Sequence, residues 1–153
     1  MELTRLLLIT ISVFCLNTNG NAQSTYDAAL AQKLGADDYG MKKYVMAFLK
    51  SGSVQLQDSA KQTELQIAHL KNIGKLAKEG KLVVAGPFMD DQPVRGIYIF
   101  NVTTIEEAKK LTETDPAIKA GVLEMELRPW YGSAALMETV NIHKRLEKKS
   151  ITD

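Results

Sequence analysis

Apolar residues recur along the chain with two different spacings, which predict alternating strands and helices. The near-continuous apolar run of "KKYVMAFLKSG", residues 42–52, indicates a strand in the middle of a sheet. Helical spacing follows over residues 59–79, where Ser59 is the expected N-cap. Two shorter apolar runs, "GKLVVAGPF" at 80–88 and "VRGIYIFNV" at 94–102, flank the turn "MDDQP" and therefore predict a β-hairpin.

One more long helix and one more strand are predicted in the second half of the domain. The segment "TTIEEAKKLTET", residues 103–114, opens with a capping box and predicts a second helix. "DPAIKAG", residues 115–121, has the proline and glycine positions of a short helical turn. In "VLEMELRPW", residues 122–130, apolar and charged residues alternate, which indicates a fourth strand with one wet face. Residues 132–149 predict a C-terminal helix.

The predicted order is strand, helix, strand, strand, helix, strand, followed by the tail helix. This is the ferredoxin-like arrangement of the α+β class, in which two helices cover one face of an antiparallel sheet. Such a two-layer domain leaves the opposite sheet face uncovered. A second copy of the chain, packed sheet against sheet, would cover it, so we expect a homodimer.

The start of the chain reads as a signal peptide. The apolar run from Leu6 to Leu16 is about eleven residues, which is shorter than the roughly 20 that a bilayer span needs. Small residues near Ala22 predict cleavage after that residue, while Phe14 disfavours lipidation of Cys15. We therefore expect a periplasmic or secreted protein without a membrane span after signal removal, and without disulfides because Cys15 is the only cysteine.

Composition excludes several classes of function. The 19 basic and 18 acidic residues nearly cancel and form no basic stripe, so no nucleic-acid partner is expected. The chain has two histidines, lacks the HExxH spacing and has no glycine-rich phosphate loop, so neither a metal nor a cofactor is expected. His143 lies among charged residues and is expected to be exposed. A small-molecule ligand remains as the partner that this composition allows.

His69 interrupts the apolar side of the first long helix. A helical projection places it about 40° from Leu65 and close to Ile73, so the imidazole faces the sheet. A buried imidazole needs a hydrogen-bond partner, because leaving it unsatisfied costs about 1–3 kcal/mol. One reading is a core histidine bonded to a backbone carbonyl, and the other is the working group of a site.

Asp115 also allows two readings. An aspartate before proline is a typical helix cap, which would use its carboxylate on backbone N–H groups. In the predicted fold, however, the segment after the second helix lies beside the first helix on the same sheet face, so Asp115 can reach His69. The carboxylate would then fix the tautomer, raise the basicity of the imidazole and leave its other nitrogen facing a substrate.

The segments "AHL", "GKLVVAGPF", "RGIYIF" and "DPAIKAGVLEMELRPW" occur in this order, and they resemble the YciI-like (YCII-related) proteins of the dimeric α/β-barrel superfamily. The resemblance covers about residues 42–131. It implies a ferredoxin-like protomer, dimerised through its sheet, with a His–Asp pair as the catalytic centre; those roles fall on His69 and Asp115. The signal peptide and the segment after Trp130 depart from the family pattern. The expected segments are a signal peptide at 1–22, a loose lead-in at 23–40, the ferredoxin-like domain at 41–131 and a C-terminal helix or tail at 132–153.

These features favour acid/base chemistry on a small organic molecule, of the lyase or isomerase type. The alternative is a non-catalytic ligand-binding or accessory homodimer, in which the pair only holds a helix to the sheet. An oxygen-using enzyme has no support beyond analogy of fold. Four further side chains are candidates for contact with a substrate: Tyr44, expected to line the pocket of the histidine, Arg95, Tyr98 and Ser133. For Arg95, a surface or interface ion pair is the favoured alternative.

Overall fold

A computed structural model describes residues 26–150, so the predicted signal peptide and its cleavage point after Ala22 lie outside the described residues. Within that range, no helix combines the length and the apolar character that crossing a membrane requires. The elements along the chain are α1 (Ala28–Leu34), β1 (Met41–Ser51), α2 (Ser59–Lys78), β2 (Leu82–Pro87), β3 (Val94–Phe100), α3 (Ile105–Thr112), α4 (Pro116–Lys119), β4 (Leu123–Ser133), the 3-10 helix η1 (Ala134–Glu138) and α5 (Thr139–Leu146).

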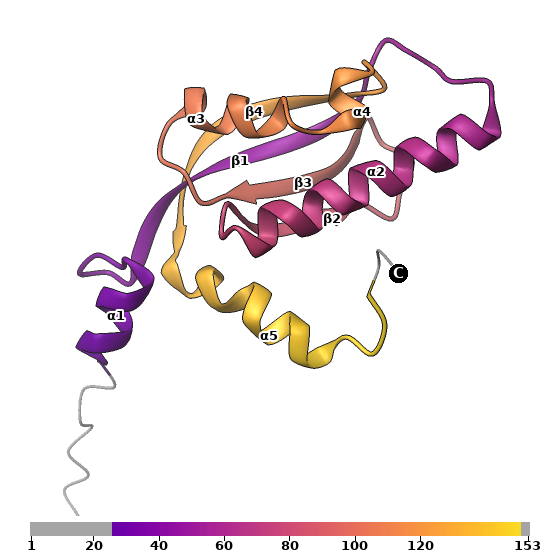
Figure 1. Ribbon diagram of the computed structural model, residues 1–153. Helices are drawn as coiled ribbons and strands as arrows, with labels where there is room; N and C mark the ends of the chain where they lie inside the picture. Colours follow the sequence, from indigo (N-terminus) through magenta and orange to yellow (C-terminus); the bar gives the residue numbers. More distant parts are fainter. Residues whose placement is uncertain (1–25, 151–153) are drawn as a thin grey trace, which may run out of the picture.

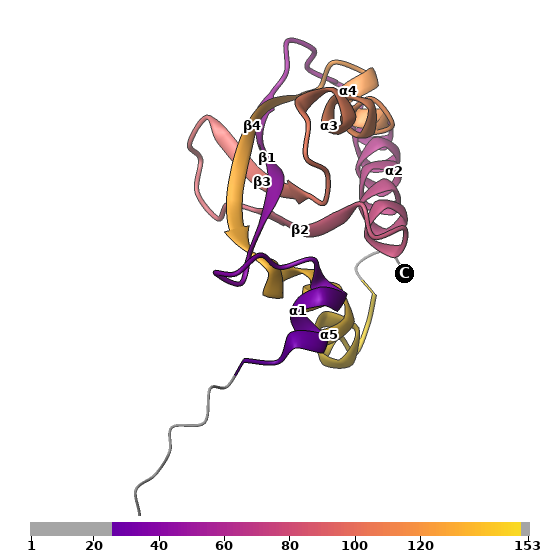
Figure 2. The same cartoon turned by 90° about the vertical axis from the view of Figure 1, so that its left-hand side faces the viewer.

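The four strands form one antiparallel sheet in the order β2-β3-β1-β4. The helices α2, α3 and α4 lie on one face of this sheet (Figures 1 and 2). This strand order, with both long crossovers through helices on the same face, is the ferredoxin-like α+β fold. The predicted fold class is therefore confirmed.

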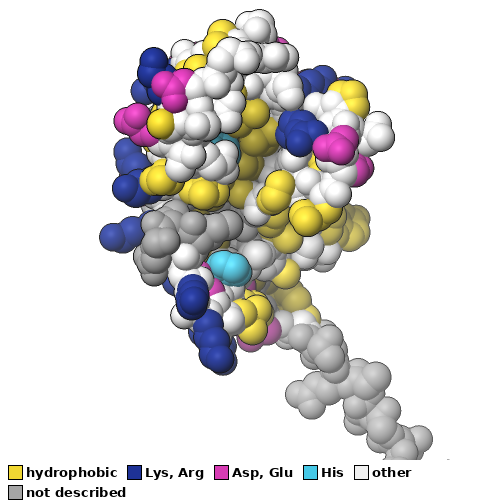
Figure 3. All heavy atoms as spheres, turned by 90° about the vertical axis from the view of Figure 1, so that its right-hand side faces the viewer, with side chains coloured by type: hydrophobic (Ala, Val, Ile, Leu, Met, Phe, Trp, Pro, Cys, Tyr) yellow, Lys and Arg dark blue, Asp and Glu magenta, His cyan; other side chains and the backbone are white. Residues whose placement is uncertain are grey.

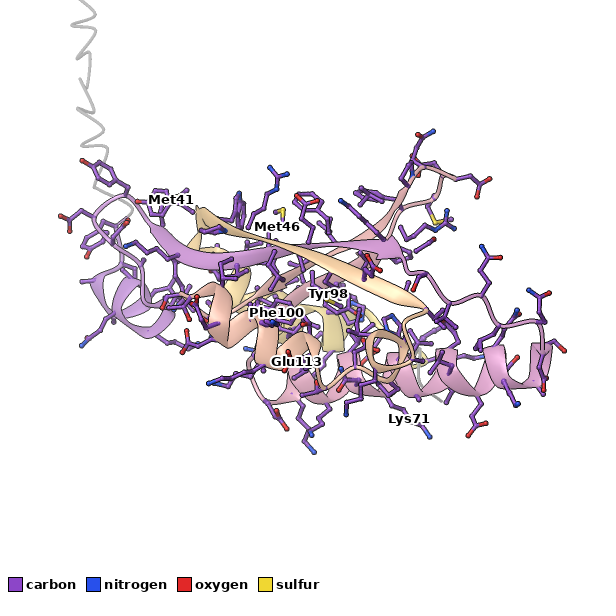
Figure 4. The ribbon with its side chains drawn as sticks, turned by 90° about the horizontal axis from the view of Figure 1, so that it is seen from above. Met41, Met46, Lys71, Tyr98, Phe100 and Glu113 are labelled. Atoms are coloured by element: carbon purple, nitrogen blue, oxygen red, sulfur yellow. The ribbon has the colours of Figure 1, made fainter. Side chains whose placement is uncertain are left out.

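The main core fills the space between the sheet and the helices. Alternate residues of β1, Val45, Ala47 and Leu49, point toward the helices and are buried. Tyr98 and Phe100 of β3 point to the same side, whereas Met46 points away from it (Figure 4). The apolar residues of the alternating fourth strand pack against this core, as their spacing predicted, and they are Leu123, Met125 and Leu127.

Helix ends follow the capping signals with one correction. The cap of α2 is Asp58, whose carboxylate accepts from the backbone N–H groups of Ala60 and Lys61, and Ser59 is the first helical residue. An ionised carboxylate at this position satisfies two otherwise free N–H groups, which explains the shift by one residue. The capping box of α3 is present as predicted, with Thr104 as its cap.

The C-terminal segment differs from the single helix predicted for residues 132–149. β4 continues to Ser133, because β1 supplies pairing partners along its whole length, and η1 and α5 follow. Leu136 and Met137 of η1 pack on the sheet face opposite the helices, near Tyr44. The N-terminal helix α1 is fixed to η1 by an ion pair of 2.8 Å between Lys33 Nζ and Glu138 Oε1. The chain thus covers one end of its own open sheet face.

Candidate active site

His69 lies in the middle of α2 on the side that faces the sheet. It is 7% exposed, and its Nδ1 is 2.8 Å from Oδ2 of Asp115. The helical projection thus placed the imidazole correctly, and the contact predicted from the order of elements is present. The other histidine, His143 on α5, is exposed as predicted; its side chain is 66% exposed.

Asp115 serves two groups at once. Its Oδ1 accepts from the backbone N–H of Ala117 at 2.8 Å and so caps α4, while its Oδ2 faces His69. The side chain is 1% exposed, and a buried carboxylate needs several hydrogen bonds to remain ionised. From the sequence, the helix cap and the imidazole contact were alternative roles for this carboxylate. Both are present because each of its two oxygens makes one of them.

Tyr98 contacts the other nitrogen of the imidazole. Its hydroxyl is 3.3 Å from His69 Nε2, and the two rings are stacked with centroids 6.3 Å apart. The ring has room on the sheet because its neighbours across β1 and β2 are Ala47 and Ala85. Burial raises the pKa of the Tyr98 hydroxyl well above its ordinary value, and the negative charge of Asp115 raises it further.

These contacts fix the direction of the hydrogen bonds. An ionised carboxylate only accepts, so the hydrogen of a neutral imidazole is on Nδ1 and points to Asp115. Nε2 of His69 is then an acceptor, and the Tyr98 hydroxyl, which keeps its proton, donates to it. Tyr98 thus donates to His69 and His69 donates to Asp115, which links the sheet through α2 to the start of α4.

A cavity of about 500 Å³ opens beside this line of groups. Its floor is the sheet surface of β2 and β3, its roof is α2, and Figure 3 shows hydrophobic side chains lining a hollow on this side of the molecule. The lining side chains are mostly apolar, and the residues that contribute to it besides His69 and Tyr98 include Leu49, Leu70, Ile73, Phe88, Val122 and Leu123. The site therefore suits a small and largely apolar molecule.

One glycine of the cavity floor is required by a close backbone approach. A Cβ atom added to Gly96 would lie 2.5 Å from the carbonyl oxygen of Gly86 and 3.0 Å from Cα of Pro87. Any larger residue would therefore push β2 and β3 apart. Gly86 and Gly96 both line the cavity, so the floor carries no side chain at these two positions.

Arg95 is at the rim of the cavity. Its side chain is 43% exposed, and its guanidinium is 3.8 Å from the fully exposed carboxylate of Asp91. Such an exposed pair contributes little to stability and is easily rearranged. Arg95 thus lines the cavity and forms the surface ion pair that was the alternative, and its role in substrate binding stays a prediction.

Tyr44 and Ser133 lie elsewhere. Tyr44 is on the open face of the sheet, where its hydroxyl donates to the backbone carbonyl of Ser133 at 3.1 Å. The Ser133 hydroxyl oxygen accepts from the N–H of Ala135 and caps η1. Successive residues of β1 point to opposite faces, so Tyr44 cannot share a face with Val45 and its neighbours. The expectation that Tyr44 lines the pocket of His69 is corrected.

Two features of the site were missed in the sequence. Gln66, one turn before His69 on α2, lines the cavity, and its i,i+3 spacing from the histidine could have indicated this. Asn72, one turn after His69, is buried and accepts from the Thr114 hydroxyl at 3.1 Å, while its Nδ2 has no partner among the described residues. No local pattern marks that contact, because it joins segments far apart in the chain.

Within residues 26–150, no group of three or more histidine, aspartate or glutamate side chains is placed to hold a metal ion. The groups available for chemistry at the cavity are therefore an imidazole with its carboxylate, a phenol and, at the rim, a guanidinium. Such a set can move a proton and can stabilise an anion.

A known family and two known proteins are similar to this chain. The family model of the YCII-related domain matches residues 43–131. The uncharacterized protein YjpA of Bacillus subtilis (strain 168) is 29% identical over 62 residues, which cover 40% of this chain and 71% of that protein. Among solved structures, the 5-chloro-2-hydroxyhydroquinone dehydrochlorinase from Burkholderia phenoliruptrix AC1100, in complex with 2,5-dihydroxybenzoquinone, aligns with a TM-score of 0.42 and 18% identity, covering 56% of this chain and 92% of that chain. The range matched by the family model includes His69 and Asp115.

Proposed function

Because this chain belongs to the YCII-related domain family, we propose that it is an enzyme acting on a small organic molecule by general acid/base chemistry of the lyase or isomerase type. His69 would transfer the proton, and Asp115 would hold the imidazole and stabilise its charged form. The observation that carries the proposal is the 2.8 Å contact between Nδ1 and Oδ2 at the wall of an apolar cavity. The chemistry of these groups requires no metal or cofactor.

The physical reason lies in the position of the pair. A carboxylate that accepts from Nδ1 stabilises the imidazolium that forms when Nε2 takes up a proton. Water is largely excluded around both side chains, which strengthens this interaction compared with solution. Positioned proton transfer of this kind contributes about 10²–10⁴-fold to reaction rates.

The experiment is exchange of carbon-bound hydrogen in D₂O, followed by proton NMR, for a panel of small enolisable ketones and esters. We expect the protein to accelerate exchange for a member of the panel, and His69→Asn to abolish this. His143→Asn is the matched control, because it removes the exposed histidine, and it should leave exchange unchanged. Exchange that survives in the His69 variant would rule out this function.

One observation favours the alternative of a non-catalytic ligand-binding or accessory protein. Both nitrogens of His69 already have partners within the protein, Asp115 and Tyr98, so the imidazole is satisfied without any ligand. In that case the pair would only join α2 to α4. A ligand found in the cavity that is released chemically unchanged, with no exchange activity toward any member of the panel, would favour this reading.

We also propose that a second copy covers the remaining open face of the sheet. Phe48 lies in the middle of this face, with the guanidinium of Arg128 at 5.9 Å from its ring centre. Glu126 contacts both Arg128 and Lys50 on the same face. Since both signs of charge lie beside an apolar centre, a two-fold copy can oppose unlike charges around it.

Export of the chain is a further proposal, supported by the apolar run of residues 6–16 and the small residues before position 23. Expression of the full chain in a bacterial host, followed by mass spectrometry of the periplasmic fraction, tests it. The expected product begins at Gln23; a product of full length in the cytoplasm would contradict export.

A further inference from the structure

The Tyr98 hydroxyl and His69 Nε2 form a pair of polar atoms facing the same cavity. They are 3.3 Å apart, which is longer than the usual separation of about 2.7–2.8 Å for a hydrogen bond from a hydroxyl. The contact is therefore weak, and both groups also line the cavity. A ligand atom that can accept from one and donate to the other would replace a long hydrogen bond by two short ones.

We propose that the ligand presents a weakly acidic hydroxyl, as in an enol or a phenol, to both atoms, which makes Tyr98 a second catalytic residue beside His69. This inference rests on the proposed function and adds the class of substrate and the group that stabilises its anion. A purely structural Tyr98 would need no access to the cavity.

The proposed step transfers one proton from the ligand hydroxyl to His69. The O–H bond of the ligand breaks, and its proton moves to Nε2 of His69, where a new N–H bond forms. The imidazolium is held by the Asp115 carboxylate through Nδ1, and the electron pair of the broken bond stays on the ligand oxygen. The Tyr98 hydroxyl, released from Nε2, donates to that oxyanion. The reverse transfer returns the proton to the ligand, on oxygen or on a conjugated carbon.

Tyr98 is suited to donate rather than to ionise. Burial and the Asp115 charge both raise the pKa of its hydroxyl, so the group keeps its proton near neutral pH. Its ring is fixed by an edge contact with Phe100, with centroids 5.7 Å apart, and by the small neighbours on β1 and β2. A donor held in place before the reaction needs no rearrangement as charge develops, which is the requirement for stabilising an oxyanion.

The rest of the cavity selects against fully ionised ligands. Among the described residues that line it, Arg95 is the one with a permanently charged side chain, and that side chain is 43% exposed. A carboxylate at Nε2 has no proton to give to the imidazole, and burying it near Asp115 would bring two negative groups together. An enol or phenol enters neutral and becomes charged only where two groups receive the charge.

The probe for this inference is 4-nitrophenol, whose anion is coloured and whose size suits the cavity. Binding is measured at a pH about one unit below the pKa of the free probe, so that the free probe is mainly neutral. We expect the wild-type protein to bind it with the colour of the anion. Tyr98→Phe, which removes only the hydroxyl, should weaken binding about tenfold or more and reduce the ionised fraction, because a hydrogen bond to a charged acceptor is lost.

Tyr44→Phe is the matched control. Tyr44 is equally buried and also donates a hydrogen bond, but it lies on the opposite sheet face. It should leave both the affinity and the colour of the bound probe unchanged. Absence of probe binding to the wild type, or equal binding and equal ionisation in the Tyr98 variant, overturns the inference.

A measurement on the wild-type protein covers the case in which Tyr98→Phe does not fold. In ¹⁵N-histidine NMR, the Nε2 signal of His69 should move from an unprotonated to a protonated position when the probe binds; an unchanged signal overturns the inference. The proposed function is tested separately by the exchange experiment with His69→Asn. Loss of exchange in that variant, together with probe binding and ionisation that do not depend on Tyr98, would support the proposed function and show that Tyr98 takes no part in it.

Discussion

Asp115→Asn is the most informative single substitution in the protein. The amide oxygen can replace Oδ1 as acceptor for the Ala117 N–H and preserve the cap of α4. The amide nitrogen then faces Nδ1 of His69, and it can only donate. The imidazole must therefore move its hydrogen from Nδ1 to Nε2, which reverses the direction of the hydrogen bonds between α4 and Tyr98.

The expected loss of stability follows from this exchange of partners. A hydrogen bond to a charged group contributes about 1.5–3 kcal/mol and one between neutral groups about 0.5–1.5 kcal/mol, so the difference is about 1–1.5 kcal/mol. Asp58→Asn is the matched control, because Asp58 caps α2 with the same kind of contacts but touches no histidine. Asparagine caps a helix about as well as aspartate, so this variant should lose no more than about 0.5 kcal/mol.

Urea unfolding gives the two free energies, and their difference removes the loss of charge that both helix caps share. The ¹⁵N signals of His69 report the tautomer directly and should show the hydrogen on Nε2 in Asp115→Asn. Equal stability of the two variants, together with an unchanged tautomer, would mean that the carboxylate does not hold the imidazole. His69 would then lack the group that is proposed to orient it.

Three further perturbations test other parts of the molecule. The pKa of Tyr98 is raised in the folded protein, which therefore keeps this proton, whereas the unfolded tyrosine loses it from about pH 10. The contribution of this residue to the free energy of unfolding should be fully present below pH 10 and fall above it by about 1.4 kcal/mol per pH unit. In alkaline urea titrations, the free energy of unfolding of Tyr98→Phe should depend correspondingly less on pH. Phe48→Asp should convert a dimer to a monomer in light scattering, whereas Ile67→Asp on the exposed side of α2 should not; a wild-type monomer would contradict the sheet-to-sheet dimer. Gly96→Ala should destabilise the protein by about 1–3 kcal/mol in thermal or urea unfolding, because its Cβ meets backbone atoms of β2. Gly74→Ala, whose Cβ would have nothing within 4 Å, should stabilise α2 by up to about 1 kcal/mol. A change of the same sign in both variants would contradict the close approach of β2 and β3.

The fold could be predicted because the local signals agree with one another. The alternation of Leu123, Met125 and Leu127 with charged residues gave the inner face of β4, and the capping box at Thr104 gave the start of α3. The tail could not be placed in the same way. Its extended part is a strand only because β1 pairs with it up to Ser133, and this long-range contact leaves no periodic mark in the sequence.

The candidate site, too, could be predicted from the sequence only in part. Helical spacing was sufficient to turn His69 toward the sheet, and the order of elements was sufficient to bring Asp115 to it. The contact between Tyr98 and Nε2 depends on how far β3 lies from α2, a distance set by the packing of the whole core. Tyr44 is on the opposite sheet face because successive residues of β1 alternate, and the near-continuous apolar run of that strand does not mark which residues face inward.

One oxygen of Asp115 caps α4 and the other contacts His69, which limits what the presence of this aspartate says about activity in related chains. An aspartate before proline at this point would be retained for the start of α4 even in a relative that has lost all chemistry, since capping alone is worth about 1 kcal/mol. Its presence is therefore a poor marker of activity. The hydroxyl of Tyr98 contributes less to the structure, because its 3.3 Å contact with His69 Nε2 is long and the neighbours of the ring leave space for it whether or not it carries oxygen. Relatives that keep the aspartate but carry phenylalanine there are the ones to examine for a binding role without catalysis.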